Sequence, residues 1–295
     1  MTATVYIEGP ACWTPQLPDW AAARAAFRAD EMPEPVATCV PRPQLLAAGD
    51  RRRAPEAVAL ALEAARMALE STRRSGDEVL AVFASAHGDL GIVDAMCRTL
   101  AETPRQVSPT RFLNSIHNAP AGMWSMAVQC MRANTAVAAG SASFATGLLE
   151  ALMLCTVEQR AVLIVTCETA ATGPLKATIG RQAPIASALI LAPRASPDAE
   201  ASLTWGLDNG SGCGARGPRT RPGRALAAGG LGDGARLLEM LAREERGSCR
   251  QALSGGQCLA LELAAGESGR TQSDSCKEGA AGAAGAERND NDRHD

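Results

Sequence analysis

The chain has 295 residues, a formal net charge of −3 and 46% hydrophobic residues, which is enough to bury a sizeable core. The slight negative charge, without a basic patch interleaved with aromatic residues, argues against nucleic acid as a partner. Ten cysteines include no Cys-x-x-Cys pair, and several lie in apolar segments, where cysteine behaves as a small buried hydrophobe. We therefore expect reduced thiols and a cytoplasmic location.

Metal, cofactor and membrane classes find no support in the sequence. Neither the cysteine spacing nor the three histidines suit a zinc site, so no metal and no cofactor is expected. The first residues lack the basic and apolar regions of a signal peptide. Apolar stretches are interrupted before they reach membrane-spanning length, so no membrane span is expected.

Strands and helices alternate through the first half of the chain. A short strand at 4–8 is expected to end at Gly9-Pro10, and a proline-rich irregular region with one helical patch at 20–28 follows. Beyond it the predicted elements are a helix at 54–71, a buried strand at 78–86, a helix at 90–100, a loop at 108–118 and a helix at 121–131.

Residues 134–152 predict a strand, a tight turn of small residues at Ala139-Gly140-Ser141, and a helix that continues to about residue 157. A strand-to-helix elbow of this kind lifts one side chain to the positive end of a helix. A nucleophile or a developing anion is favoured at that position.

The second half begins with two continuous apolar runs, at 160–167 and 185–191, which predict central strands buried on both faces. Alternation of such strands with helices indicates an α/β layered domain, expected over residues 1–264. Its later parts are a flexible loop at 209–224, with five glycines and four arginines, a helix at 234–242 and a hairpin at 249–263. From Ala265 the composition is that of a disordered acidic tail.

Four stretches, in order, resemble the amino-terminal half of the β-ketoacyl synthases, the condensing enzymes of the thiolase fold. They are the helix at 54–69, the segment at 108–125, the elbow, and the strand and loop at 165–175. The most similar subgroup is the short, chain-length-factor-like proteins found beside true ketosynthases in aryl-polyene-type pigment pathways. The resemblance implies an α/β, thiolase-like fold: the amino-terminal half of the ketosynthase fold, with a layered mixed sheet and covering helices.

Two departures from the family bear on chemistry. The position of the family's cysteine nucleophile is Ser141, and a serine hydroxyl needs a nearby base where a thiolate does not. The family also uses two histidines from its carboxy-terminal half, whereas His87 and His117 lie in the amino-terminal half and His294 in the tail. Condensation by this chain alone is therefore not expected, and Ser141 also fits the role of a helix N-cap or of a tight-packing residue.

The first functional hypothesis is a non-catalytic or catalytically impaired subunit. Such a subunit forms a heterodimer with an active ketosynthase, meets its acyl carrier protein and shapes chain length in polyene- or fatty-acid-like biosynthesis. By the resemblance, strand pairing across the dimer would use the edge from Asn134 to Gly140. The other candidate interface and channel residues are Phe112, Asn114, His117, Asn118 and Trp124.

Two other hypotheses stay open. One is a serine-dependent acyltransferase or thioesterase with Ser141 as nucleophile and His87 or His117 as base, in which the amides of Gly140 and Ser141 form an oxyanion hole. The other is a binding module whose arginine clusters, at 51–53 and 216–224, meet an acidic carrier protein. Solvated loop arginines explain the same clusters.

Overall fold

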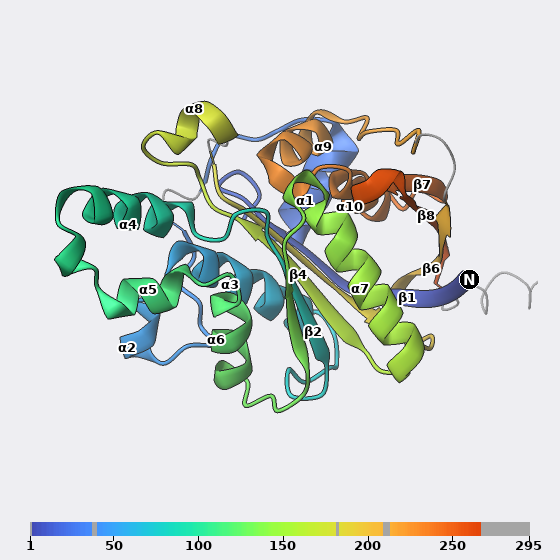
Figure 1. Ribbon diagram of the computed structural model, residues 1–295. Helices are drawn as coiled ribbons and strands as arrows, with labels where there is room; N and C mark the ends of the chain where they lie inside the picture. The colour runs from blue at the N-terminus through green and yellow to red at the C-terminus, as the bar shows by residue number, and fades with distance from the viewer. Residues whose placement is uncertain (1, 37–39, 181–182, 209–212, 267–295) are drawn as a thin grey trace, which may run out of the picture.

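The computed structural model describes residues 2–36, 40–180, 183–208 and 213–266. Within them one eight-stranded sheet has the order β3-β2-β4-β5-β1-β6-β8-β7 (Figure 1). The strands are β1 (Thr2–Trp13), β2 (Leu80–Ala84), β3 (Asn134–Val137), β4 (Val162–Glu168), β5 (Ile185–Ala192), β6 (Ala199–Asp208), β7 (Gly247–Ala252) and β8 (Cys258–Ala265).

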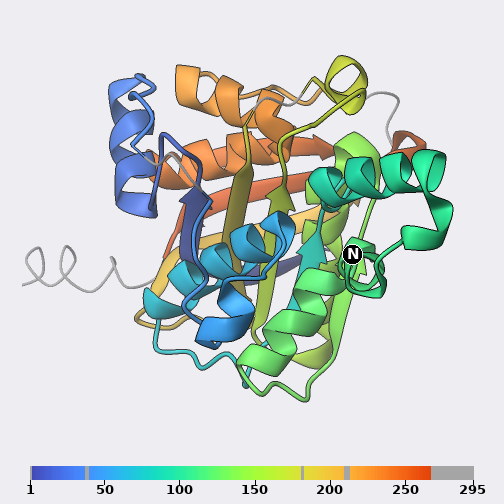
Figure 2. The ribbon, with the colours of Figure 1, turned by 90° about the vertical axis from the view of Figure 1, so that its left-hand side faces the viewer.

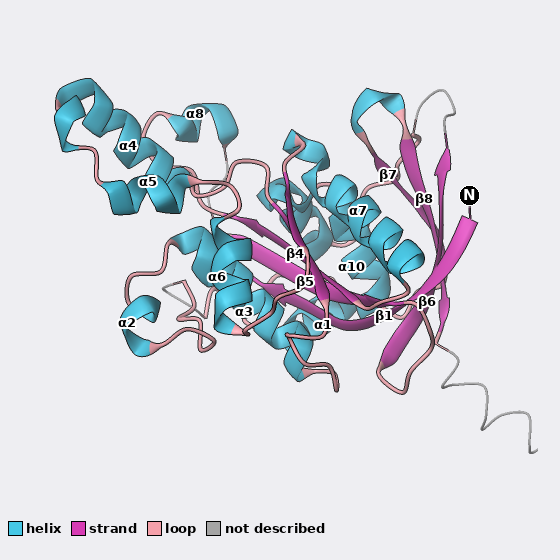
Figure 3. Ribbon diagram, turned by 60° about the horizontal axis from the view of Figure 1, so that its bottom comes forward, coloured by secondary structure: helices cyan, strands magenta, loops and turns pink. Residues whose placement is uncertain are grey.

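The helices pack on both faces of this sheet. They are α1 (Trp20–Ala29), α2 (Ala48–Arg51), α3 (Glu56–Glu70), α4 (Leu90–Glu102), α5 (Pro109–Ser115), α6 (Ala119–Ala127), α7 (Ser143–Glu158), α8 (Leu175–Ile179), α9 (Arg221–Leu226) and α10 (Gly234–Ala242). Figure 2 shows α3 and α6 in front of the strands, while α7 and α10 cover the opposite face. Helices α4 and α5 lie together to one side of the body (Figure 3).

The sheet is mixed, with its parallel part at one edge. Strand β2 pairs in parallel with β3 and β4, and every other neighbouring pair is antiparallel. The parallel strands are joined through covering helices, as a parallel connection requires. The expected α/β architecture is confirmed.

Strand β4 is buried along its whole length, because its side chains alternate between two hydrophobic clusters. Val162 and Ile164 pack on the side of α7, whereas Leu163 and Val165 pack on the side of α3. Close contact of α7 with the sheet depends on Gly147, where a Cβ would come within 2.7 Å of the Cβ of Ala84. The apolar run at 160–167 is therefore the central strand that its composition predicted.

Strand β1 does not end at Gly9-Pro10 as expected. Gly9 adopts a φ of +53° and a β-bulge follows Glu8, after which pairing with β5 resumes at Ala11. A Cβ at Gly9 would lie 2.4 Å from the carbonyl oxygen of Ala68, so glycine permits both the backbone conformation and the close approach of α3.

Several further elements were not expected from the sequence, among them α5, β6 and α9. Helix α5 occupies most of the predicted loop at 108–118: the Ser108 hydroxyl accepts a hydrogen bond from the Arg111 N–H, and Pro109 opens the helix, a common start signal. Strand β6 alternates buried Ala201, Leu203 and Trp205 with more exposed residues. Helix α9 begins inside the segment expected to be a flexible loop.

The expectation that all thiols are reduced is wrong for one pair, since Cys213 and Cys258 form a disulfide. It ties the segment before α9 to the start of β8, whose Cα atoms lie 5.2 Å apart at this point. The cytoplasmic location stays a prediction, because the disulfide removes one of its premises. The acidic tail lies outside the described residues from position 267 onward.

Candidate functional site

The elbow between β3 and α7 is a tight turn closed by Ser143. Its hydroxyl accepts a hydrogen bond from the Ala139 N–H at 2.9 Å and donates one to the Gly140 carbonyl at 2.7 Å. Gly140 has a φ of +56°, a conformation that favours glycine. The predicted strand, turn and helix are therefore present, with Ser143 as the residue that holds the turn.

Ser141 is exposed at the tip of this turn. The N-cap of α7 is Ala142, which provides no side-chain cap, so the interpretation of Ser141 as a capping residue is wrong. Within the described part of the chain, no hydrogen bond to the Ser141 hydroxyl is found. Its side chain stands at the place where the ketosynthase resemblance puts a nucleophile.

A cavity of about 340 Å³ adjoins Ser141. The turn before α10 forms another wall of the cavity. This turn approaches the elbow closely, since a Cβ at Gly232 would lie 3.1 Å from the Ser141 carbonyl oxygen. Asp233 and Ser254 also line the cavity, and the Asp233 carboxylate accepts a hydrogen bond from the Ala252 N–H at 3.1 Å. Neither His87 nor His117, the two histidines among the described residues, lines this cavity.

The two histidines lie near the carboxyl end of β2. The His117 Nε2 is 2.8 Å from the Ser85 carbonyl oxygen, which ties the junction between α5 and α6 to β2. His87 is exposed in the turn that follows the strand, where the Gly88 N–H donates to the Ser85 hydroxyl at 2.9 Å. Within the described residues, His117 therefore contacts a backbone carbonyl, and a pairing of Ser141 with either histidine stays a prediction.

Two acidic side chains near this end of the sheet have structural partners. The Asp89 carboxylate caps α4 through the Ile92 N–H at 2.9 Å and also accepts from the Ala57 N–H at 3.1 Å. The buried Glu168 accepts from the Ala86 N–H at 2.5 Å. Among the described residues, no three His, Cys, Asp or Glu side chains form a group that could hold a metal ion.

The predicted interface residues differ in exposure. Phe112 is 56% exposed on α5, Asn114 is half-buried and Asn118 is exposed. Trp124 is 0% exposed, and its ring packs against Phe83 at a centroid distance of 5.8 Å. The Trp124 indole therefore serves core packing in this chain.

Strand β3 forms one edge of the sheet. It pairs with β2 only, and within the described ranges no strand pairs with its outer side. Apolar side chains are exposed on α6 and α7, which contact β3, and on the segment that leads into β3. They are Met126 on α6, Met131 before β3, and Met153 and Val157 on α7. Leu113 on α5 and Ile116, directly after α5, are also exposed. The signal for α5 was present as apolar residues at helical spacing after Ser108-Pro109.

A profile of the family "Beta-ketoacyl synthase, N-terminal domain" matches residues 19–217. This chain belongs to that β-ketoacyl synthase family. The expected resemblance to this family is confirmed. No curated protein sequence matches the chain significantly.

Solved structures of ketosynthase systems share this fold. A chain of the complex of the ketosynthase ApeO with its chain length factor ApeC from Xenorhabdus doucetiae is 21% identical, with a TM-score of 0.65 over 88% of this chain and 99% of that chain. A chain of the ishigamide ketosynthase/chain length factor is 15% identical, with a TM-score of 0.67 over 89% and 99%. A chain of AntDE:AntF, a type II polyketide synthase acyl-carrier protein in complex with its ketosynthase, is 11% identical, with a TM-score of 0.66 over 89% and 99%.

In this ketosynthase-family chain the elbow helix α7 is strongly apolar. Residues Gly140–Glu158 are long and apolar enough to cross a membrane by length and composition alone. Leu148 and Leu152 of α7 lie in the core cluster against β2 and β4, which is the setting of a core helix in a globular protein. Other residues of α7 remain uncovered, among them the exposed Val157.

Proposed function

We propose that this ketosynthase-family chain is a partner subunit without condensing activity of its own. It pairs through β3 with an active β-ketoacyl-ACP synthase and shapes the length of the acyl chain in polyene- or fatty-acid-like biosynthesis. The observation that carries the proposal is the unprotected edge of β3, flanked by exposed apolar side chains on the adjacent helices.

Edge strands usually carry features that prevent pairing with another chain, such as charged residues, proline or a bulge. Strand β3 reads Asn134-Thr135-Ala136-Val137 and carries neither charge nor proline. Its pairing with β2 has no register shift, so the outer side presents a regular row of backbone groups. Such an edge is a template for a strand from a partner.

The apolar side chains beside β3 support burial by a partner rather than by solvent. Met126 is 71% exposed and Met131 is 97% exposed. Removing apolar surface from water contributes about 25 cal/mol per Å², so a subunit that covers these side chains gains stability. Exposed apolar patches of this kind commonly mark protein–protein interfaces.

The solved complexes that share this fold contain a ketosynthase with a chain length factor, and one contains an acyl carrier protein. We extend both kinds of partner to this chain. In the proposed heterodimer Phe112 is the candidate for the residue that ends the partner's acyl channel. A bulky ring there would limit length sterically, because overpacking costs about 1–3 kcal/mol.

The proposal gives Ser141 no catalytic role. No histidine among the described residues lines the cavity beside its hydroxyl, and a serine without a base is a poor nucleophile at neutral pH. The test of the serine-dependent alternative is a serine-reactive probe. Labelling of the native chain that is lost in Ser141→Ala would support that alternative.

Native mass after co-expression with the ketosynthase encoded nearest to this chain in its genome tests the pairing. A stable one-to-one heterodimer is expected. A soluble monomer or homodimer that does not bind the ketosynthase would refute the proposed pairing. In the active complex, Phe112→Ala should lengthen the product, whereas Leu207→Ala on the exposed side of β6 should leave its length unchanged. Equal products from both variants would remove the role of Phe112.

A further inference from the structure

A cavity lined by five arginines lies at the sheet edge opposite β3. Its volume is about 650 Å³, within the range of roughly 300–1,000 Å³ that holds small molecules. It lies between β7, α10 and the segment that follows Cys213, and its lining includes Arg216, Arg219, Arg236, Arg246 and Arg250.

Some of these guanidinium groups already have carboxylate partners. Buried Arg236 contacts Glu239 and Glu245, and Arg250 contacts Asp208 at 2.6 Å. The side chains of Arg216, Arg219 and Arg246 have no ion pair or hydrogen bond with any described residue. The cavity therefore keeps positive charge that no carboxylate of the described chain neutralises.

The segment that carries Arg216 and Arg219 is held at both ends. The disulfide of Cys213 fixes its start. At its other end, the N–H groups of Arg219 and Thr220 donate to the buried Glu239 carboxylate, at 3.0 and 2.6 Å. A binding segment fixed in advance loses less conformational entropy when a ligand arrives.

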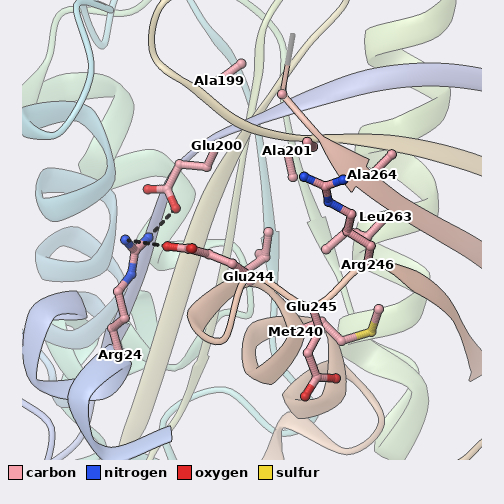
Figure 4. A pocket seen from close by; sticks show the side chains of 13 residues that line it. Arg24, Ala199, Glu200, Ala201, Met240, Glu244, Glu245, Arg246, Leu263 and Ala264 are labelled. Atoms are coloured by element: carbon pink, nitrogen blue, oxygen red, sulfur yellow. Dashed lines mark hydrogen bonds and ion pairs between the residues drawn. The ribbon is translucent and has the colours of Figure 1, made fainter. Parts of the chain in front are cut away.

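An adjacent cavity shows the opposite balance of charge. It shares Met240, Glu245 and Arg246 with the arginine-lined one. Figure 4 shows its Arg24 guanidinium directed at two carboxylates, those of Glu200 and Glu244. The positive charge of Arg24 is thus neutralised within the chain, whereas no carboxylate among the described residues pairs with Arg216 or Arg219.

We propose that the arginine-lined cavity binds a small ligand through a diphosphate group. A phosphate group carries roughly −1.5 to −2 charges near neutral pH, so two linked groups match the unneutralised guanidinium groups. The planar guanidinium forms paired hydrogen bonds with phosphate oxygens. The concave shape favours a small molecule over an acidic protein surface, and the proposal is independent of the pairing through β3.

Isothermal titration calorimetry with inorganic pyrophosphate tests this site. The protein is the full chain in the form in which it is soluble, alone or with its ketosynthase. We expect saturable binding at low salt, and a Kd at least tenfold weaker in Arg216→Gln/Arg219→Gln. The matched control Arg52→Gln/Arg105→Gln removes the same net charge from exposed arginines elsewhere and should leave the Kd unchanged within twofold.

A parallel titration with ADP distinguishes the sources of the diphosphate. Tighter binding of ADP than of pyrophosphate would assign a nucleotide, and equal binding a free diphosphate. No saturable binding of either, or equal weakening by the control pair, would overturn the proposal. So would carrier-protein binding that depends on Arg216 and Arg219 without any pyrophosphate binding. Arg246→Gln provides a second variant if the double variant has a lowered Tm.

Discussion

Replacing Ala136 by proline tests the edge pairing at a single backbone group. Hydrogen bonds from the Ala81 N–H to the Ala133 carbonyl and from the Ser85 N–H to the Val137 carbonyl show that odd-numbered residues of β3 face β2. By the alternation of a β-strand, the N–H of Ala136 points outward. Proline there removes an outward donor and leaves the pairing with β2 in place, as is tolerated on edge strands.

The expected loss can be worked out from one hydrogen bond. In a complex paired along β3, the missing donor leaves one carbonyl of the partner strand buried and unpaired. That costs about 1–3 kcal/mol, which weakens the Kd roughly five- to 150-fold. The free chain should lose little stability, because its own sheet keeps every hydrogen bond that the native chain makes at this position.

Sedimentation velocity across a dilution series of the co-expressed complex measures this change. The matched control is Ser248→Pro on β7, the opposite edge. The Leu253 N–H bonds to the Gln257 carbonyl, so by alternation the Ser248 N–H also points outward. The control should dissociate as the native complex does. If the Ala136→Pro complex has the same Kd as the native complex, with unchanged circular dichroism and Tm, pairing through β3 would be refuted.

Three further predictions concern stability and thiol chemistry. Arg74→Met should lower the free energy of unfolding by about 3 kcal/mol at pH 7, at the low end for a buried pair because Arg74 is partly exposed. The reason is that the substitution leaves the fully buried Glu8 carboxylate without its cation. In urea titrations, the double variant Glu8→Gln/Arg74→Met should recover most of the lost stability. A loss below about 1 kcal/mol in Arg74→Met would contradict this explanation. Burial alone would raise the pKa of Glu239, but hydrogen bonds from neighbouring side chains and backbone N–H groups outweigh it and hold that pKa below the ordinary 4.5. The stabilisation of the fold by ionised Glu239 is therefore present above pH 4.5 and lost as the pH falls through the lowered pKa. In urea titrations from pH 6 to pH 3, the free energy of unfolding should depend less on pH in Glu239→Gln than in the native chain. Parallel curves for the two proteins would show that Glu239 does not contribute. Burial raises the pKa of the Cys12 thiol to about 12. At pH 8 a thiol reagent should therefore label exposed Cys97 and leave Cys12 unmodified in the native chain. Peptide mass spectrometry measures the labelling, and equal labelling of both thiols would place Cys12 in contact with solvent.

The sequence predicts those elements whose residue pattern fits only one type of secondary structure. Strand β4 is an uninterrupted apolar run, and only a strand buried on both faces satisfies it. The same holds for α10, which occupies the predicted residues 234–242, and for the hairpin of β7 and β8. The elbow also follows, because small residues at Ala139-Gly140 permit a turn that larger side chains would block.

Other features depend on contacts that no local pattern contains. The path of β1 through Gly9 follows from the approach of the Ala68 carbonyl across the fold, and Trp124 lies in the core because Phe83 packs beside it. That neither His87 nor His117 lines the Ser141 cavity likewise follows from three-dimensional placement. Helix α5 is different, since Ser108-Pro109 was a readable start signal.

The strand order places β3 and β7 at opposite ends of an eight-stranded sheet. Neighbouring strands are about 4.8 Å apart, so the seven steps between these edges span roughly 34 Å. A protein paired along β3 and a diphosphate held beside β7 would make no contact with each other. At that distance salt would also screen the electrostatic interaction between them. Each should therefore bind with the same affinity whether or not the other is present, and a measured coupling would mean that the sheet between them changes conformation.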